Sequence, residues 1–199
     1  FLDDDGYRRP QFWFMDGIET VRREGWTAPG YWHKVDGQWF EFTLSGLRPL
    51  DPGLPVSHVS YYEAAAYATW AGHRLATEVG WEWAAAWLPA NIEDGANLMN
   101  SDRLHPSVAS AISGDATSRP RQMIGDLWEW TQSPYSNYPG FRSAIGAIGE
   151  YNGKFMANQM VLRGGSCATS AGHIRTTYRN FFYPHQRWMF SGIRLAADA

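Results

Sequence analysis

A chain of 199 residues with 44% hydrophobic and 19% charged residues has the composition of a soluble globular protein, and it is long enough for one domain with its own core. Its formal net charge of −3 offers no basic surface for nucleic acid or an anionic membrane, and no apolar run reaches the roughly 20 residues of a membrane span. We therefore expect one domain over residues 1–199, with neither nucleic acid nor membrane as a partner.

The residue types themselves narrow the class of fold and the compartment. A single cysteine excludes an internal disulfide and favours a reducing, cytoplasmic location. The 11 Trp, 10 Tyr and 10 Phe beside 20 Gly and 11 Pro predict a core rich in aromatic rings and much irregular backbone. Because the chain opens at Phe1 without an initiator Met, we expect it to be a piece of a longer protein.

The first regular element is a β-hairpin. Asp36-Gly37 between aromatic-rich flanks is typical of a type I′ turn, whose two central residues need positive φ. This pattern predicts strands over Tyr31–Val35 and Gln38–Thr43.

Two helices follow the hairpin. Ser60 and Glu63 form a capping box before an alanine-rich run, and Gly72 stands where a left-handed residue would end that helix. Tyr62, Ala66 and Trp70 share one helical face, which we expect to be buried. The second helix has Thr77 as its N-cap and is expected to stop at Pro89.

The rest of the chain reads as a long loop followed by short strands. Residues 91–121 show no periodicity, which predicts a long ordered loop with Gly and Pro turns; loops of this length are usually functional or disordered. Strand-like runs lie near Leu127–Thr131, Met160–Gly164, His173–Arg179 and Gly192–Ala196. A hairpin, two helices and then short strands predict an α+β fold with small antiparallel sheets.

The residue types that most often catalyse reactions or bind metals give little indication of a site in this sequence. None of the six histidines lies in a His-x₃-His or His-x-His spacing, so no metal site is predicted from one element. Cys167 lacks a neighbouring base and is predicted to be a buried structural thiol. Glu78, Glu82 and Glu129 lie among aromatic residues, where a glutamate more often anchors amide or indole N–H groups than serves as one of a catalytic acid pair.

The C-terminal segment is rich in both arginine and aromatic rings. It carries Arg175, Arg179, Arg187 and Arg194 among the rings of Phe181, Phe182, Tyr183, Trp188 and Phe190. Arginine binds carboxylates through its planar fork, and aromatic faces attract quaternary ammonium groups, so an amino-acid betaine would fit such a wall. A closing strand whose arginines pair with the rest of the chain is an equally good interpretation.

Four blocks, "PVSHVSYYEAAAYATWAGHRLATEVGWEWAA", "GDLWEWT", "VLRGGS" and "SGIRLA", make the chain resemble the formylglycine-generating-enzyme-like (sulfatase-modifying-factor) superfamily. The resemblance implies a C-type-lectin-like α+β fold with two main helices and sparse secondary structure. Formylglycine generators hold copper through two cysteines after the Arg-Gly-Gly-Ser motif. With Cys167 alone, this chain is not expected to share that activity.

Longer stretches, including "GDLWEWTQSPYSNYPGF" and "TTYRNFFYPHQRWMFSGIRLA", resemble the ergothioneine-biosynthesis sulfoxide synthases. The resemblance implies an enzyme that uses non-haem Fe(II) and O₂ to join a cysteine-type thiol to C2 of N-α-trimethylhistidine. In this family the iron ligands are histidines of an N-terminal DinB-like domain, which this chain lacks. The chain would then be the C-terminal half and depend on that domain for iron.

In this family the substrate loop reads Asn-Trp-Asp-Tyr-Pro-x-x-Arg in members that use γ-glutamylcysteine. Asn180 and Phe181 match its first two positions, whereas Phe182 replaces Asp and Gln186 replaces Arg, with Arg187 one residue later. The resemblance assigns Asn180, Phe181, Phe182, Gln186 and Arg187 to substrate binding. Losing both polar groups favours free cysteine or another small thiol.

Two further features come from the resemblance. Tyr135, Tyr138 and Tyr151 are candidates for the proton-donating tyrosine of the family. A structural calcium near the carbonyls of Gly125 and Leu127 and the carboxylate of Glu129 is a further expectation, although Gln122 replaces the usual Asn. Two alternatives stay open: a related selenoneine synthase, and a non-catalytic ligand-binding module on the same fold.

Overall fold

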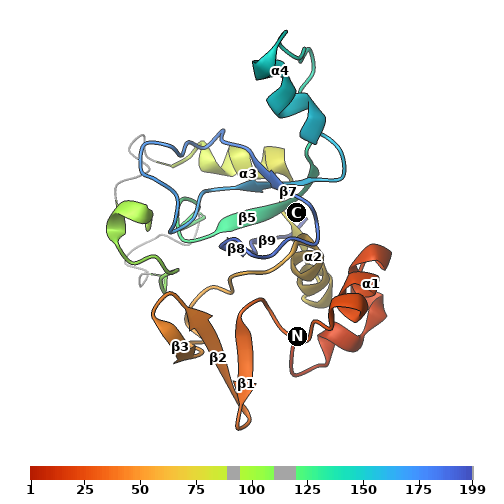
Figure 1. Ribbon diagram of the computed structural model, residues 1–199, viewed down its shortest axis with the longest axis vertical. Helices are drawn as coiled ribbons and strands as arrows, with labels where there is room; N and C mark the ends of the chain where they lie inside the picture. The colour runs from red at the N-terminus through yellow and green to blue at the C-terminus, as the bar shows by residue number, and fades with distance from the viewer. Residues whose placement is uncertain (89–94, 110–119, 199) are drawn as a thin grey trace.

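The computed structural model describes residues 1–88, 95–109 and 120–198 (Figure 1). Its α-helices are α1 (Met15–Glu24), α2 (Tyr61–Trp70), α3 (Glu78–Ala85) and α4 (Ala147–Asn152), and its short 3₁₀ turns are Gly6–Arg8, Pro10–Phe12, Met99–Ser101 and Gly153–Phe155. Its strands are β1 (Trp32–Val35), β2 (Gln38–Thr43), β3 (Gly46–Pro49), β4 (Arg74–Leu75), β5 (Trp128–Pro134), β6 (Met160–Arg163), β7 (Asn180–Phe182), β8 (Ser191–Gly192) and β9 (Leu195–Ala196). The predicted α+β class with much irregular backbone is confirmed.

The predicted hairpin is present and is extended by a third strand. Asp36 and Gly37 have φ of 49° and 82°, as a type I′ turn requires. Strand β1 begins at Trp32, one residue later than predicted, because Tyr31 has a left-handed φ of 65°. Strand β3, which the sequence analysis did not predict, completes the order β1-β2-β3, and this sheet extends from one end of the body in Figure 1.

The capping box of α2 is confirmed in both directions. The backbone N of Glu63 donates to Ser60 Oγ at 3.1 Å, and the backbone N of Ser60 donates to Glu63 Oε2 at 2.7 Å. Gly72 has φ of 71°, as predicted for the residue beyond the helix. Of the predicted buried face, Ala66 is fully buried, whereas Tyr62 and Trp70 are half-buried.

Helix α3 begins where predicted and ends earlier. The side chain of Thr77 accepts from the backbone N of Gly80 at 2.9 Å, which caps the helix. Glycine has no side chain, so the second bond of a capping box is missing. The helix closes at Ala85, before Pro89, which lies outside the described residues. Residues 91–94 and 110–119 of the predicted long loop also lie outside them, and the described part of that loop contains the short turn Met99–Ser101.

The central sheet has the order β7-β6-β5-β8. Strands β5 and β6 were predicted near their observed positions, but the strand predicted over His173–Arg179 is wrong. The carbonyls of Thr176 and Tyr178 instead accept hydrogen bonds from the buried Arg163, at 2.9 and 3.3 Å. The strand of this region is β7, which begins at Asn180.

The predicted closing strand over Gly192–Ala196 is divided between two sheets. Ser191–Gly192 pairs with β5, and this pairing is parallel, whereas only antiparallel pairing was predicted. Leu195–Ala196 pairs antiparallel with β4. Between them, the side chain of Arg194 turns toward β5, where it contacts Glu129. This ion pair lies where the chain passes from one sheet to the other.

Two helices were not predicted, and they lie in different settings. Helix α1 packs its Ile18 and Val21 against α2, in a small aromatic core with Tyr7 and Trp13. A larger core around Trp81 and Trp130 lies between α2, α3 and the central sheet. Helix α4 extends away from the body at the opposite end from β1–β3 (Figure 1). No described helix is long and apolar enough to cross a membrane.

Candidate functional site

Strand β7 carries the first three predicted substrate-binding residues at the edge of the central sheet. Asn180, Phe181 and Phe182 pair with Leu162, Val161 and Met160 of β6, so the first three residues of the predicted substrate loop form a strand. Successive side chains of a strand point to opposite faces. Phe181 therefore lies on one face of β7, and Asn180 and Phe182 lie on the other.

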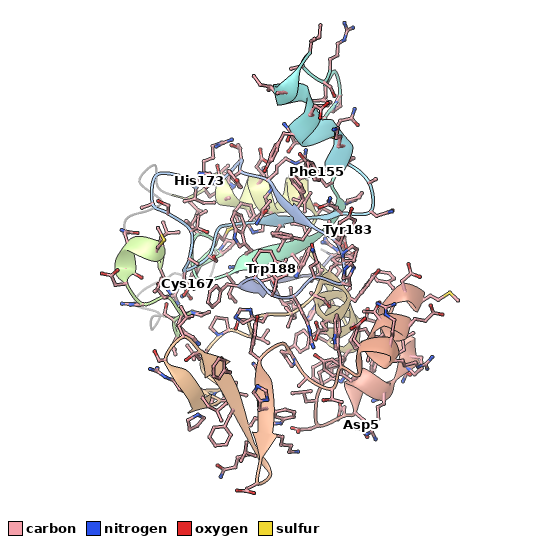
Figure 2. All side chains as sticks on the ribbon, viewed as in Figure 1. Asp5, Phe155, Cys167, His173, Tyr183 and Trp188 are labelled. Carbon is pink, nitrogen blue, oxygen red and sulfur yellow. The ribbon has the colours of Figure 1, made fainter. Side chains whose placement is uncertain are left out.

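Phe181 is the centre of a cluster of rings. Its ring stacks on that of Tyr135, with centroids 3.9 Å apart and an interplanar angle of 9°. Phe155 contacts Phe181 from α4's side, at 5.8 Å, and Tyr151 contacts Phe155 at 5.7 Å. Figure 2 shows Phe155 at the base of the segment that carries α4. We call Tyr135, Tyr138, Tyr151, Phe155 and Phe181 the aromatic edge.

Arg179 joins two of the candidate tyrosines. Its guanidinium lies 4.3 Å from the ring centroid of Tyr138 and 4.8 Å from that of Tyr135. The three tyrosines proposed from sequence therefore lie on one edge of the sheet, but they differ in exposure. Tyr135 is buried and donates to Asn152 Oδ1 at 3.2 Å, whereas Tyr138 and Tyr151 are 49% and 67% exposed. Burial raises the pKa of Tyr135 above its usual value.

Phe182, on the other face of β7, contacts a residue that the sequence analysis did not assign to the site. Its ring meets Trp188 edge to face, with centroids 5.2 Å apart. Trp188 also lines a pocket of about 430 Å³, together with Phe42, His58 and Phe190. The aromatic content of the segment after β7 was the only sequence signal for Trp188.

Gln186 and Arg187 make contacts within the chain. Gln186 Oε1 accepts from the backbone N of Tyr183 at 3.0 Å and closes the turn after β7. Arg187 donates from Nη1 to Glu63 Oε1 and to the carbonyl of Ala28, both at 2.8 Å, and its guanidinium lies 3.9 Å from the ring of Trp26. Arg187 does bind a carboxylate, but that carboxylate belongs to the protein.

Two of the other arginines of the C-terminal segment also bind glutamates of the chain. Arg179 binds both oxygens of Glu78, and Arg194 binds both oxygens of Glu129. The exposed Arg175 lies over the ring of Tyr178. Of the two interpretations left open by the sequence, the structure shows arginines that pair with the rest of the chain. The glutamates are their partners, and Glu129 also accepts from the indole N–H of Trp81 at 2.6 Å.

At the calcium site predicted from Gly125, Leu127 and Glu129, the carboxylate of Glu129 is already bound by an arginine. The guanidinium of Arg194 lies 2.6 and 2.7 Å from the two carboxylate oxygens of Glu129 and also donates to the carbonyl of Arg121. A calcium ion would have to displace it, so this geometry does not fit a calcium ligand at Glu129. Calcium binding stays a prediction.

The residues that could bind a metal or react as nucleophiles are dispersed. Within residues 1–88, 95–109 and 120–198, no three His, Cys, Asp or Glu side chains form a group that could hold a metal ion. Cys167 is fully buried, as predicted, and burial raises the pKa of its thiol to about 12. Nδ1 of His58 is buried without a hydrogen-bond partner in the described structure, and burial lowers the pKa of this imidazole to about 4.

Comparison with known proteins supports the fold and the family that the sequence resembles. The chain is 39% identical to the hercynine oxygenase of Mycolicibacterium thermoresistibile and 38% identical to that of Mycobacterium tuberculosis, in each case over all of this chain and 47% and 49% of the relative. It therefore spans about half the length of these relatives. The formylglycine-generating enzyme of Streptomyces coelicolor is 31% identical over 85% of this chain and 59% of its own.

Among solved structures, PvdO from Pseudomonas aeruginosa has the same fold, with a TM-score of 0.52 and 18% identity over 90% of this chain and 75% of its own. The resemblance and the fold inferred from the sequence are thus confirmed, including the formylglycine-generating-enzyme architecture. Over residues 1–114 and 120–199 the sequence matches the sulfatase-modifying factor enzyme 1-like domain, and the chain belongs to that family.

Proposed function

We propose that this chain is the substrate-binding half of a cytoplasmic, iron- and O₂-dependent sulfoxide synthase, which joins a cysteine-type thiol to C2 of N-α-trimethylhistidine in ergothioneine biosynthesis. Similarity to hercynine oxygenases over the whole chain supports the substrate, since hercynine is N-α-trimethylhistidine. The observation that carries the proposal is the aromatic edge, a cluster of rings around Phe181, which matches the aromatic position of the family's substrate motif.

The aromatic edge suits a quaternary ammonium ligand. Ring faces attract such a cation because of their negative quadrupole, and a half-exposed cluster can admit one without losing a core contact. The carboxylate of Glu78 beneath Arg179 keeps this region close to neutral, so an arginine there does not repel a cationic substrate. In the proposal, Phe181 binds the trimethylammonium group, and Asn180 lies with Phe182 on the opposite face of the strand.

The aromatic edge also supplies candidates for a general acid. A proton donor must be protonated at working pH and must reach the substrate. Tyr138 and Tyr151 have exposed rings, whereas the hydroxyl of Tyr135 is already bonded to Asn152. We therefore propose Tyr138 or Tyr151 as the donor and give Tyr135 a role in packing Phe181.

The thiol donor is proposed to be free cysteine. A γ-glutamyl group would require an acidic or basic side chain to hold its extra charges, and Phe182 and Gln186 provide neither. Phe182 packs on Trp188, so its surroundings are apolar. Arg187 already pairs with Glu63 through Nη1, so part of its charge is neutralised within the chain.

Iron is proposed to come from a DinB-like domain of the same protein. The described residues form no group of three His, Cys, Asp or Glu side chains that could hold a metal ion. Bound Fe(II) would activate O₂. The contribution of this chain is to bind and orient trimethylhistidine and thiol, and to supply a proton.

Turnover by the full-length protein tests the proposal. With Fe(II), O₂, trimethylhistidine and cysteine, mass spectrometry should detect the cysteinyl sulfoxide, and γ-glutamylcysteine should react more slowly. The selenium analogue of cysteine tests the alternative of a selenoneine synthase. Binding of trimethylhistidine without turnover on any thiol would replace the proposal with the ligand-binding module.

A further inference from the structure

We infer that Glu78 is a positioning residue for the aromatic edge, and that it acts through Arg179 on Tyr135 and Tyr138. Glu78 is the first residue of α3 and is almost fully buried. Its backbone N donates to Ser133 Oγ of β5 at 3.0 Å, so both ends of the residue are fixed. Within the described residues, the hydrogen bonds that its carboxylate accepts all come from arginines.

Glu78 holds two arginines from different segments. Oε1 accepts from Arg163 Nη2 at 2.8 Å and from Arg179 Nε at 2.5 Å, and Oε2 accepts from Arg179 Nη2 at 2.9 Å. The bond to Arg179 is bidentate, which fixes the plane of the guanidinium as well as its position. Arg163 closes β6 and Arg179 directly precedes β7, so Glu78 joins α3 to two neighbouring strands.

The fixed plane of Arg179 is what the two tyrosine rings pack against. Tyr138 and Tyr135 lie 4.3 and 4.8 Å from the same guanidinium. Tyr135 in turn stacks on Phe181. If the guanidinium rotates, both rings lose the flat cation that orients them, and the support of Phe181 loosens.

A second path leads from Glu78 to the hydroxyl of Tyr138. Arg163 Nη2 donates to Glu78, to Glu82 at 2.6 Å and to Tyr138 Oη at 3.3 Å. Tyr138 is thus contacted by one arginine on its ring and by another on its oxygen. Its aromatic ring is otherwise half exposed, so these two contacts define its position.

Charge balance makes Glu78 the residue on which the arrangement depends. Two guanidinium groups, of Arg163 and Arg179, face the carboxylates of Glu78 and Glu82. Glu82 contacts only Arg163 and is partly exposed. Neutralising Glu78 leaves Arg179 without its carboxylate in a buried setting, which favours movement of the side chain toward solvent.

Glu82 provides a matched control. It lies one helical turn after Glu78, binds the same Arg163, and does not contact Arg179. Glu78→Gln and Glu82→Gln remove the same charge from the same helix, but only the first releases the guanidinium between the tyrosines. Arg179→Lys is the second test, because an ammonium keeps the charge and loses the planar fork.

The experiment compares these variants in the full-length protein. NMR of ¹³C-labelled tyrosine, assigned with Tyr135→Phe and Tyr138→Phe, should show displaced ring signals for both residues in Glu78→Gln and Arg179→Lys but not in Glu82→Gln. Calorimetry should show that Glu78→Gln weakens binding of trimethylhistidine about tenfold, as expected for one lost charged contact. The KM for trimethylhistidine should rise by a similar factor, with a smaller change in kcat.

The effect on substrate rests on the proposed function, whereas the displaced rings do not. Displaced signals without turnover in any form would leave the positioning role standing and remove the sulfoxide synthase proposal. Unchanged tyrosine signals in a folded Glu78→Gln or Arg179→Lys protein overturn the inference. If Glu78→Gln does not fold, as judged by circular dichroism, Arg179→Lys decides the question alone. A residue important only for stability would reduce the folded fraction and leave the KM of the folded enzyme unchanged.

Discussion

Two buried carboxylate–guanidinium pairs, Glu129 with Arg194 and Glu78 with Arg179, have almost the same geometry and different surroundings. In both, two nitrogens of one arginine bind two oxygens of one glutamate, at 2.6 and 2.7 Å for Arg194 and at 2.5 and 2.9 Å for Arg179. Arg194 then donates to a backbone carbonyl, and Glu129 accepts from the buried Trp81. Arg179 instead lies against Tyr138, whose ring is half exposed.

Two buried ion pairs of similar geometry can therefore have different roles in one fold. Glu129 and Arg194 contact only groups that hold the chain together, so their removal should change stability alone. Glu78 and Arg179 also orient side chains that reach solvent, so their removal should change binding as well.

Arg194→Met has the largest expected effect. It leaves the carboxylate of Glu129 buried with only the indole N–H of Trp81, and an uncompensated buried charge costs about 3 kcal/mol or more. Urea unfolding followed by tryptophan fluorescence measures the loss, with the exposed Arg175→Met as control. The tyrosine NMR signals of the folded variant should match those of the wild type. Displaced signals would mean that the two pairs do not differ as we describe.

The stability of the protein should also fall on acidification, for a reason separate from both pairs. The folded state holds the pKa of His58 at about 4, below its ordinary value of 6.5, so the unfolded chain binds more protons between these values. Stability therefore rises with pH in this window, and about 2 kcal/mol is lost from pH 7 to pH 5. His58→Gln should remove this slope, whereas the exposed His73→Gln should retain it. Equal slopes in all three proteins would contradict the assignment to His58.

Local signals in the sequence predicted the local structure. The capping box of Ser60 and Glu63 and the Asp36-Gly37 turn each depend on residues within three positions, and both were confirmed. Strand β7 was missed because its existence depends on pairing with β6, and its three residues have no distinctive alternation. The strand predicted just before it failed because Arg163 takes the carbonyls that a partner strand would need.

The candidate site was predicted residue by residue, but its contacts were not. The resemblance proposed Phe181 from the family's motif and the three tyrosines as candidates, and the structure brings these residues to one edge. The pairing of Arg179 with Glu78 spans 101 residues and that of Arg187 with Glu63 spans 124, so no local pattern indicates either. The sequence alone could not distinguish arginines that bind a ligand from arginines that bind the protein.

Phe181→Leu should have a moderate effect on stability and a clear one on binding. Losing the stacked contact with Tyr135 costs about 1 kcal/mol, which chemical denaturation can resolve. Calorimetry should show weaker binding of trimethylhistidine. Phe182→Leu is the matched control on the opposite face of the same strand, where the ring contacts Trp188. It should leave that affinity unchanged and alter the KM for the thiol. Equal losses of trimethylhistidine affinity in both variants would show that the two faces of β7 do not divide the substrates.

Tyr151→Phe has the smallest expected effect on folding. The side chain is 67% exposed and its one ring contact, with Phe155, does not involve the hydroxyl, so the free energy of unfolding should change by less than about 0.5 kcal/mol. If this phenol donates the proton, turnover should fall at least about a hundredfold, while trimethylhistidine still binds. Tyr138→Phe removes the hydroxyl of the other candidate donor and is the variant with which Tyr151→Phe is compared. A large loss in one variant and not in the other identifies the donor. Full activity in both would assign proton donation to Tyr135 or to a group outside the aromatic edge, and Glu78 would then orient the rings of Tyr138 and Tyr135 for another purpose than donation by Tyr138.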